Sequence, residues 1–231
     1  MSESIGPLSQ FAEGVWTAQT PVSIVGMKLS SSMTVLRLKD NKLLLYSPIE
    51  MTPECKEAVD SLGQVTHLYA PNLFHHMFVK SWADEYPDAK VHAPAGLEKK
   101  QPNLRMERLH NSEPEPDFSE VVEEFPIKGF RLIETALLYR PTKTVLVADL
   151  VHNVGRPEGG WTKFYTKTMG FYDRVALSRM IRWTAFSDKK AAKRSIEHLL
   201  SQDFDSLIVG HGTPLESDAK EILRQALEWL L

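Results

Sequence analysis

The stretch TVLVADLVHN, residues 144–153, runs from a continuous apolar segment directly into Asp149, with His152 three positions later. A short apolar run bounded by turn residues is typical of a buried strand. In folds that pack helices on sheets, ligand-binding and catalytic groups gather beyond the carboxyl ends of the strands. This stretch therefore predicts a functional side chain at the end of a buried strand.

Two other stretches repeat this arrangement. THLYAPNLFHH, residues 66–76, places His75 and His76 after an apolar strand, and SLIVGHGTPL, residues 206–215, places His211 between two glycines. Those glycines permit close backbone approach and an unusual φ. One carboxylate and two imidazoles from three strand ends form a ligand set for a divalent metal. The alternative is that each of these residues has an ordinary structural role, as a cap or a hydrogen-bonded imidazole in a turn.

Composition describes an ordinary globular chain. It has 231 residues, of which 42% are hydrophobic and 25% charged, a net charge of -3 and one cysteine, Cys55. These values predict neither a disulfide framework nor a general attraction to nucleic acid or anionic membranes. The N-terminus lacks the features of a signal peptide, and no apolar run has the length of a membrane span. We therefore expect one domain over residues 1–231, in the cytoplasm, with neither nucleic acid nor membrane as a partner.

Along the chain, strand patterns precede and then alternate with helix patterns. Residues 14–48 indicate a β-meander with a turn at 40–41, and helices are expected over 52–63 and 73–86. The second half repeats the order, which favours two packed sheets with helices outside, a four-layer αββα sandwich of the α/β (α+β) class. A doubly wound parallel sheet fits less well, because the first half indicates hairpins.

Residues 155–173 are rich in glycine and aromatic side chains, which indicates an ordered loop or lid. Its candidate substrate contacts are Trp161, Lys163, Tyr165 and Lys167. The alternative is a packing segment with lysines that reach solvent.

The segments VADLVHN and IVGHG, with their order along the chain, resemble the metallo-β-lactamase-fold superfamily, an αββα sandwich of hydrolases with relatives among oxidoreductases. The stretch from Pro71 to Leu97 is most similar to a branch known as a domain of unknown function. The superfamily motif H-x-H-x-D-H aligns with APNLFH, residues 70–75, so that only His75 is retained. The middle histidine aligns near Phe130 or Arg131.

The resemblance implies which metal ligands remain. All three histidines of the first metal position are lost, whereas three of four ligands of the second remain, as His75, Asp149 and His211. A mononuclear site is therefore expected, with zinc first and iron or manganese as alternatives. The residues that could replace or orient a ligand are Asn72, His76, Glu134 and His152.

The functional expectation is a metal-dependent hydrolase of small esters, thioesters or lactones. The ion would lower the pKa of a bound water and polarise the substrate, and Asn72, Asp149 and His152 would act in catalysis. The alternative is a non-catalytic, metal-free binding protein on a degenerate fold. Ferrous oxygen chemistry also fits two histidines and one carboxylate. The oligomeric state is left open.

Overall fold

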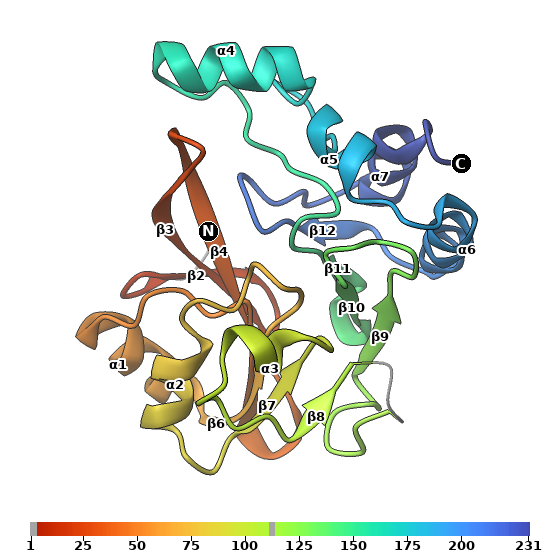
Figure 1. Cartoon of the computed structure of the whole chain (residues 1–231). Coiled ribbons are helices and arrows are strands. Elements are labelled where there is room, and N and C mark those ends of the chain that lie inside the picture. Colours follow the sequence, from red (N-terminus) through yellow and green to blue (C-terminus); the bar gives the residue numbers. More distant parts are fainter. Residues whose placement is uncertain (1–3, 111–113) are drawn as a thin grey trace.

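Two β-sheets lie face to face with helices on their outer sides in the computed structural model, which describes residues 4–110 and 114–231 (Figure 1). The first sheet contains, in spatial as in chain order, β1 (Ser4–Ile5), β2 (Leu8–Ala12), β3 (Val15–Ile24), β4 (Met27–Arg37), β5 (Lys42–Tyr46), β6 (Gln64–Tyr69), β7 (Lys90–Ala93) and β8 (Arg108–Leu109). The second sheet has the order β12 (Ser206–Ile208), β11 (Thr144–Leu146), β10 (Thr135–Tyr139) and β9 (Val122–Pro126). The helices are α1 (Pro53–Leu62), α2 (Val79–Glu85), α3 (Leu97–Lys100), α4 (Gly160–Met169), α5 (Arg179–Thr184), α6 (Lys189–Leu200) and α7 (Ala219–Leu227).

Three apolar clusters show how these layers pack. One lies between the first sheet and α1 to α3 and includes Val59 and Trp82, and another lies between the second sheet and α6 and α7. The third joins the two sheets through residues such as Leu44 and Leu137. Strand β5 shows why the layers pack on both sides of the first sheet. Its side chains alternate between the helices and the opposite sheet, and both faces of the strand are buried. The predicted αββα sandwich is confirmed.

Strand direction changes within each sheet. β1 to β5 pair in antiparallel fashion, as the hairpin patterns predicted, whereas β5 to β8 are parallel. In the second sheet β11 pairs in parallel with β12. The carboxyl ends of β6, β11 and β12 carry the three stretches singled out by the sequence. None of the described helices is both long and apolar enough to span a bilayer.

One turn and one helix start differ from the sequence expectations. The apolar run 15–29 is divided at Val25–Gly26, where both residues have positive φ, 50° and 73°, as a two-residue hairpin turn requires. An apolar valine at the turn hides it in the sequence. Helix α2 starts at Val79 instead of Leu73; the residues before it form turns, in which Oδ1 of Asn72 accepts the backbone N–H groups of Phe74 and His75. The predicted lid segment, in contrast, contains a regular helix, α4.

Candidate metal centre

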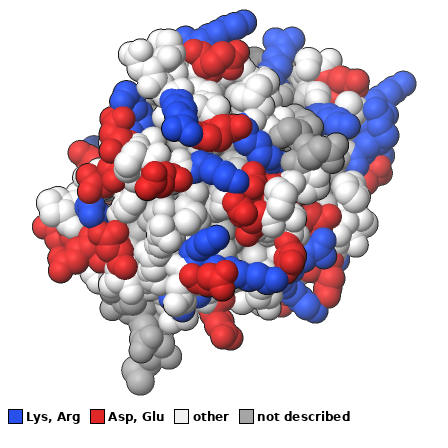
Figure 2. Space-filling view, turned by 90° about the horizontal axis from the view of Figure 1, so that it is seen from below, with Lys and Arg blue, Asp and Glu red and all other residues white. Residues whose placement is uncertain are grey.

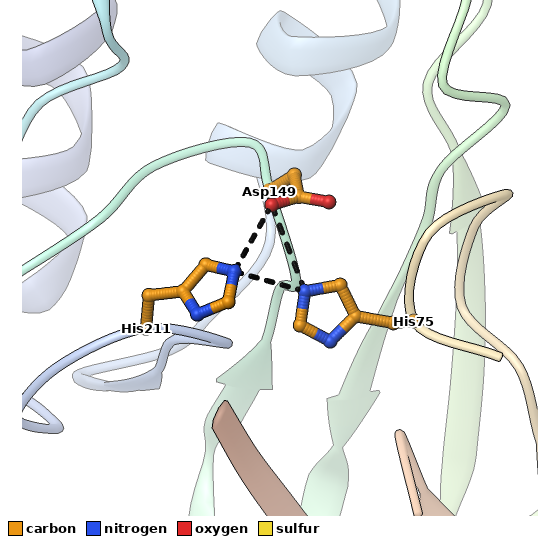
Figure 3. A group of neighbouring side chains, drawn as sticks. All are labelled: His75, Asp149 and His211. Atoms are coloured by element: carbon orange, nitrogen blue, oxygen red, sulfur yellow. Dashed lines mark hydrogen bonds and ion pairs between the residues drawn. The ribbon is translucent and has the colours of Figure 1, made fainter. Parts of the chain in front are cut away.

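His75, Asp149 and His211 meet between the two sheets, and all three side chains are buried. His75 comes from the turn after β6, Asp149 follows β11 by three residues, and His211 follows β12 by three. Figure 3 shows both imidazoles directed at one carboxylate oxygen of Asp149. The topology thus joins three residues that lie more than 60 positions apart in the chain.

The three ligand atoms form a nearly regular triangle. Nε2 of His75 lies 3.3 Å from Nε2 of His211, and Oδ1 of Asp149 lies 3.6 Å and 3.4 Å from these two nitrogens (Figure 3). Ligands at tetrahedral angles and about 2.0–2.1 Å from zinc lie about 3.3–3.4 Å from one another. The spacing of the triangle therefore fits one tetrahedral metal ion with a fourth position left for another ligand.

The other ring nitrogens face hydrogen-bond partners outside the triangle. Nδ1 of His211 lies 2.7 Å from the carbonyl oxygen of Ser30, which can only accept, so this nitrogen carries a proton. Nδ1 of His75 lies 2.8 Å from the hydroxyl oxygen of Ser47. Partners of this kind orient metal-binding histidines and set the tautomer. Both imidazoles therefore present Nε2 to the centre.

Asp149 is positioned by a buried network. Its Oδ2 accepts a hydrogen bond of 2.9 Å from the side-chain amide of Asn72, which also donates to Glu134 at 3.1 Å. The carboxylate of Glu134 in turn accepts the backbone N–H groups of Ala148, Asp149 and Leu150. The Glu134 oxygens are thereby engaged with the protein, and the carboxylate supports the backbone that carries Asp149.

Burial and the neighbouring charges shift the pKa values of this group. Burial and the nearby charge of Asp149 raise the pKa of Glu134 to about 7. Burial alone would raise the pKa of Asp149, but the imidazoles of His75 and His211 outweigh it and hold this pKa well below its usual range. The pKa of His211 is raised, because its hydrogen bond and charge interaction with Asp149 exceed the effect of burial. The centre is thus a site where opposite charges are brought together out of water.

The two glycines beside His211 are required by close packing, as the sequence predicted. A β-carbon on Gly210 would lie 2.5 Å from the carbonyl oxygen of Ala148 and 2.8 Å from Cε1 of His75. Gly212 has a φ of 104°, and a β-carbon there would overlap the carbonyl of Asn153. Glycine therefore lets the last loop approach both other ligands.

The remaining predicted residues lie at different distances from the centre. His152 is buried with its ring 5.4 Å from that of His211, and its Nδ1 has no hydrogen-bond partner among the described residues. Burial, with a smaller effect of His211, lowers the pKa of His152 to about 4. His76 points elsewhere, to the side chain of Gln101 at 3.3 Å. Phe130, one of the two positions aligned with the middle histidine, stacks on Phe186.

A cavity of about 860 Å³ lies beside the loop that carries His211, and none of the three candidate ligands lines it. It lies between the β3–β4 hairpin and the start of α4, and its walls include Ser30 and Gly212, which contact or adjoin His211. Of the four predicted lid residues, Trp161 lines this cavity. Lys163, Tyr165 and Lys167 lie on the same helix, outside the cavity wall.

Ser30 and Ser47 hold the two imidazoles, and neither residue was predicted from the sequence. Ser47 follows β5 directly and has a positive φ of 55°, a strand-end position that resembles those of the ligands. That position was the available signal. Ser30 acts through its backbone carbonyl, which every residue possesses, so no residue type could indicate it.

Comparison with solved structures identifies the class of fold. The DIM-1 metallo-β-lactamase exposed to ceftazidime superimposes with a TM-score of 0.68 at 11% identity over 97% of both chains. A metallo-β-lactamase from Pontibacter korlensis gives 0.66 at 12% identity over 96% of this chain and 97% of that one. The FIM-1 metallo-β-lactamase from Pseudomonas aeruginosa in its mono-zinc form gives 0.64 at 11% identity, over 96% and 94%. The protein has the metallo-β-lactamase fold.

Within this fold class the chain belongs to the family described as a domain of unknown function (DUF4336), whose model matches residues 12–169. The matched region includes His75, Asp149 and the hairpin, and ends with α4. No curated protein matches the chain. The predicted match to a domain-of-unknown-function family is confirmed.

Proposed function

We propose that the protein is a hydrolase that depends on one divalent metal ion, held by His75, Asp149 and His211. The observation that carries this proposal is the triangle of ligand atoms, with edges of 3.3, 3.4 and 3.6 Å, which fits tetrahedral coordination. The FIM-1 enzyme in its mono-zinc form is a case in which this fold holds a single zinc ion. Two imidazoles and a carboxylate also accept iron or manganese.

Asn72 stands, in the resemblance to the superfamily, where the motif has a histidine of the first metal position, and its side chain bonds Glu134 instead. Asn72 aligns with the second motif histidine, and its amide group already bonds Glu134, Asp149 and two backbone N–H groups. Because these groups satisfy one another, they support a mononuclear site. We assign Asn72 and Glu134 as positioning residues for Asp149 and His75.

When bound, a divalent cation supplies Lewis acidity, which polarises a carbonyl oxygen and lowers the pKa of water. The residues of the chain would provide the rest. His75 and His211 keep their Nε2 atoms on the centre, and His152, with Nδ1 unpaired among the described residues, is the proposed proton acceptor. Water addition to the acyl carbon and departure of the alcohol or thiol then require one proton to move from the water to the leaving group.

Esters, thioesters or lactones of small molecules are the proposed substrates. The cavity beside His211 has the volume of typical small-molecule sites and mixes apolar walls such as Leu29 and Trp161 with Gln19 and Lys28. Its position next to the loop that carries His211 would bring a bound acyl group within reach of the centre. Trp161 is the part of the predicted lid that would cover it.

The second candidate is a binding protein without metal or catalysis. The 3.3 Å separation of the two Nε2 atoms is also that of a direct hydrogen bond, so a proton could take the place of a metal ion. An ion pair of Asp149 with the imidazoles would then hold the sheets together.

Metal analysis of protein purified without chelator separates the two candidates. The hydrolase should contain about one equivalent of zinc, iron or manganese and lose it in His211→Ala, while the exposed His198→Ala control retains it. Active protein should hydrolyse an aryl ester, an acyl thioester or a lactone, and Asp149→Asn should abolish this. Metal-free protein that gains no thermal stability from added zinc would overturn the proposal.

A further inference from the structure

Exposed apolar side chains gather at one end of the molecule. Among the described residues, six large hydrophobic side chains at the tip of the β3–β4 hairpin, on α4 and on α5 are exposed; we call them the apolar rim: Ile24, Val25, Trp161, Phe164, Met180 and Trp183. Trp183 is 75% exposed and Phe164 60%. Contiguous apolar surface of this kind marks an interaction site.

Contacts between the elements show that the apolar rim is continuous. The indole nitrogen of Trp161 donates to the carbonyl oxygen of Val25 at 3.0 Å, and its ring lies 5.9 Å from that of Phe164. Tyr165, on the same helix, reaches Met180 with its hydroxyl group at 3.5 Å. In Figure 1, α4 lies at the outer end of the molecule beyond the hairpin, followed by α5.

Helix α4 faces the rest of the protein with a narrow side. Of its ten residues, only Thr162 and Thr166 are buried. At 100° per residue, Phe164 projects from the opposite, outward side, and the half-exposed Trp161 lies between this side and the hairpin. A helix that exposes aromatic side chains and buries threonines has its apolar side directed at something outside the chain.

Positive charge surrounds the apolar rim. Residues 156–184, which include α4 and α5, contain six lysines and arginines but two acidic residues, in a protein of net charge -3. Lys163 and Lys167 flank the aromatic side of α4, and neither has a carboxylate within ion-pair distance among the residues the structure describes. The face seen from below, opposite α4, interleaves both signs of charge instead (Figure 2).

We propose that the apolar rim docks on an anionic lipid surface. Helices that lie in a membrane interface combine aromatic side chains with flanking lysines, and tryptophan prefers the headgroup region. The local surplus of positive charge complements anionic headgroups, whereas the whole-chain net charge averages it away. This surface also borders the cavity through Trp161, so a docked molecule would open its cavity towards the lipid.

Vesicle binding of the full chain tests the proposal, and it needs neither metal nor substrate. We expect the protein to bind vesicles of equimolar phosphatidylcholine and phosphatidylglycerol, and to bind vesicles of phosphatidylcholine alone only weakly. Binding to the anionic vesicles should decrease as salt is added. Phe164→Ala with Trp183→Ala should weaken binding about tenfold or more. Lys163→Glu with Lys167→Glu should weaken it by at least about fivefold per lysine. Neither pair fills the core, so folding is retained.

Matched controls lie on other faces of the molecule. Met77→Ala removes an exposed apolar side chain and Lys99→Glu reverses an exposed charge, and both should bind as wild type. Retained vesicle binding in His211→Ala would separate this surface from the metal centre. The proposal is overturned if the protein does not bind anionic vesicles, or if the rim variants bind them as well as wild type does. It is also overturned if the protein binds no vesicles but forms a dimer that the rim substitutions dissociate.

Discussion

Asn72 and Asp149 are joined by a buried hydrogen bond of 2.9 Å from the side-chain amide of one to the carboxylate of the other. The same asparagine accepts the backbone N–H group of His75 at 2.8 Å. Asn72, which follows β6 of the first sheet, thus positions two of the three proposed ligands. Where the superfamily motif has a histidine, this chain has a group that connects the ligands.

Asn72→Ala should therefore lower both stability and metal affinity. The change removes one donor from each of two buried carboxylates and leaves two backbone N–H groups without their acceptor, so we expect the free energy of unfolding to fall by about 2–4 kcal/mol. Metal affinity should fall about 10–100-fold, as for other supporting residues of metal sites. Urea denaturation and competitive metal titration measure the two effects. The exposed Asn103→Ala serves as control, and equal affinity in both variants would contradict the assigned role.

Gly210→Ala should displace His75. The added methyl group would lie 2.5 Å from the Ala148 carbonyl oxygen and 2.8 Å from the His75 ring. We therefore expect the free energy of unfolding to fall by about 1–3 kcal/mol and the metal content to fall as well. Gly160→Ala is the matched change, since no atom lies within 4 Å of its added methyl group. Thermal denaturation and metal content compare the two. A Gly210→Ala protein with normal metal content would show that the loop can shift away from His75.

The layered fold was predictable because its strands have strong local signals. Strand β5 reads as an apolar run that both flanking layers bury, and Thr52 caps α1 through the backbone N–H of Cys55, as its sequence indicates. The turn at Val25–Gly26 was missed, because a valine with positive φ has no favourable local signal. Tertiary contacts, including the bond from Trp161, hold it there.

The clustering of the three candidate ligands could be expected from the sequence, and their support only in part: Asn72 and Glu134 were among the predicted orienting residues, whereas Ser30 and Ser47 were not. His75, Asp149 and His211 each follow a strand, and the topology brings strand ends together. The bonds of Asn72 to Glu134 and of His211 to the Ser30 carbonyl depend on distances across layers, which no spacing along the chain encodes.

Ser47→Ala should affect the metal centre more than the fold. The hydroxyl group of Ser47 lies 2.8 Å from Nδ1 of His75, so its loss frees the ring to rotate and to change tautomer. We expect metal affinity to fall about tenfold and stability by about 1 kcal/mol. Ser61→Ala, which removes a hydroxyl group bonded within α1, should change stability alone. Equal metal affinity in the two variants would remove Ser47 from the site.

Three buried histidines outside the metal centre should make the protein sensitive to acid. Burial lowers the pKa of His67 to about 4, of His92 to about 2 and of His110 to about 3. The unfolded state, with a histidine pKa near 6.5, therefore binds more protons than the folded state below that pH. Stability is fully present above about pH 6.5 and falls as the pH approaches 4, by up to about 1.4 kcal/mol per pH unit for each histidine.

His110→Phe tests this pH dependence separately from the metal centre. The His110 ring stacks on Tyr69 at 4.6 Å, and neither ring nitrogen has a hydrogen-bond partner among the described residues, so phenylalanine keeps the packing. Because one titrating group is removed, the variant should lose less stability than wild type between pH 6.5 and pH 4, by up to about 3 kcal/mol at the acid end. Urea denaturation across this range measures the difference, with the exposed His198→Ala as control. Parallel curves for His110→Phe and wild type would mean that His110 is already accessible to protons in the folded state.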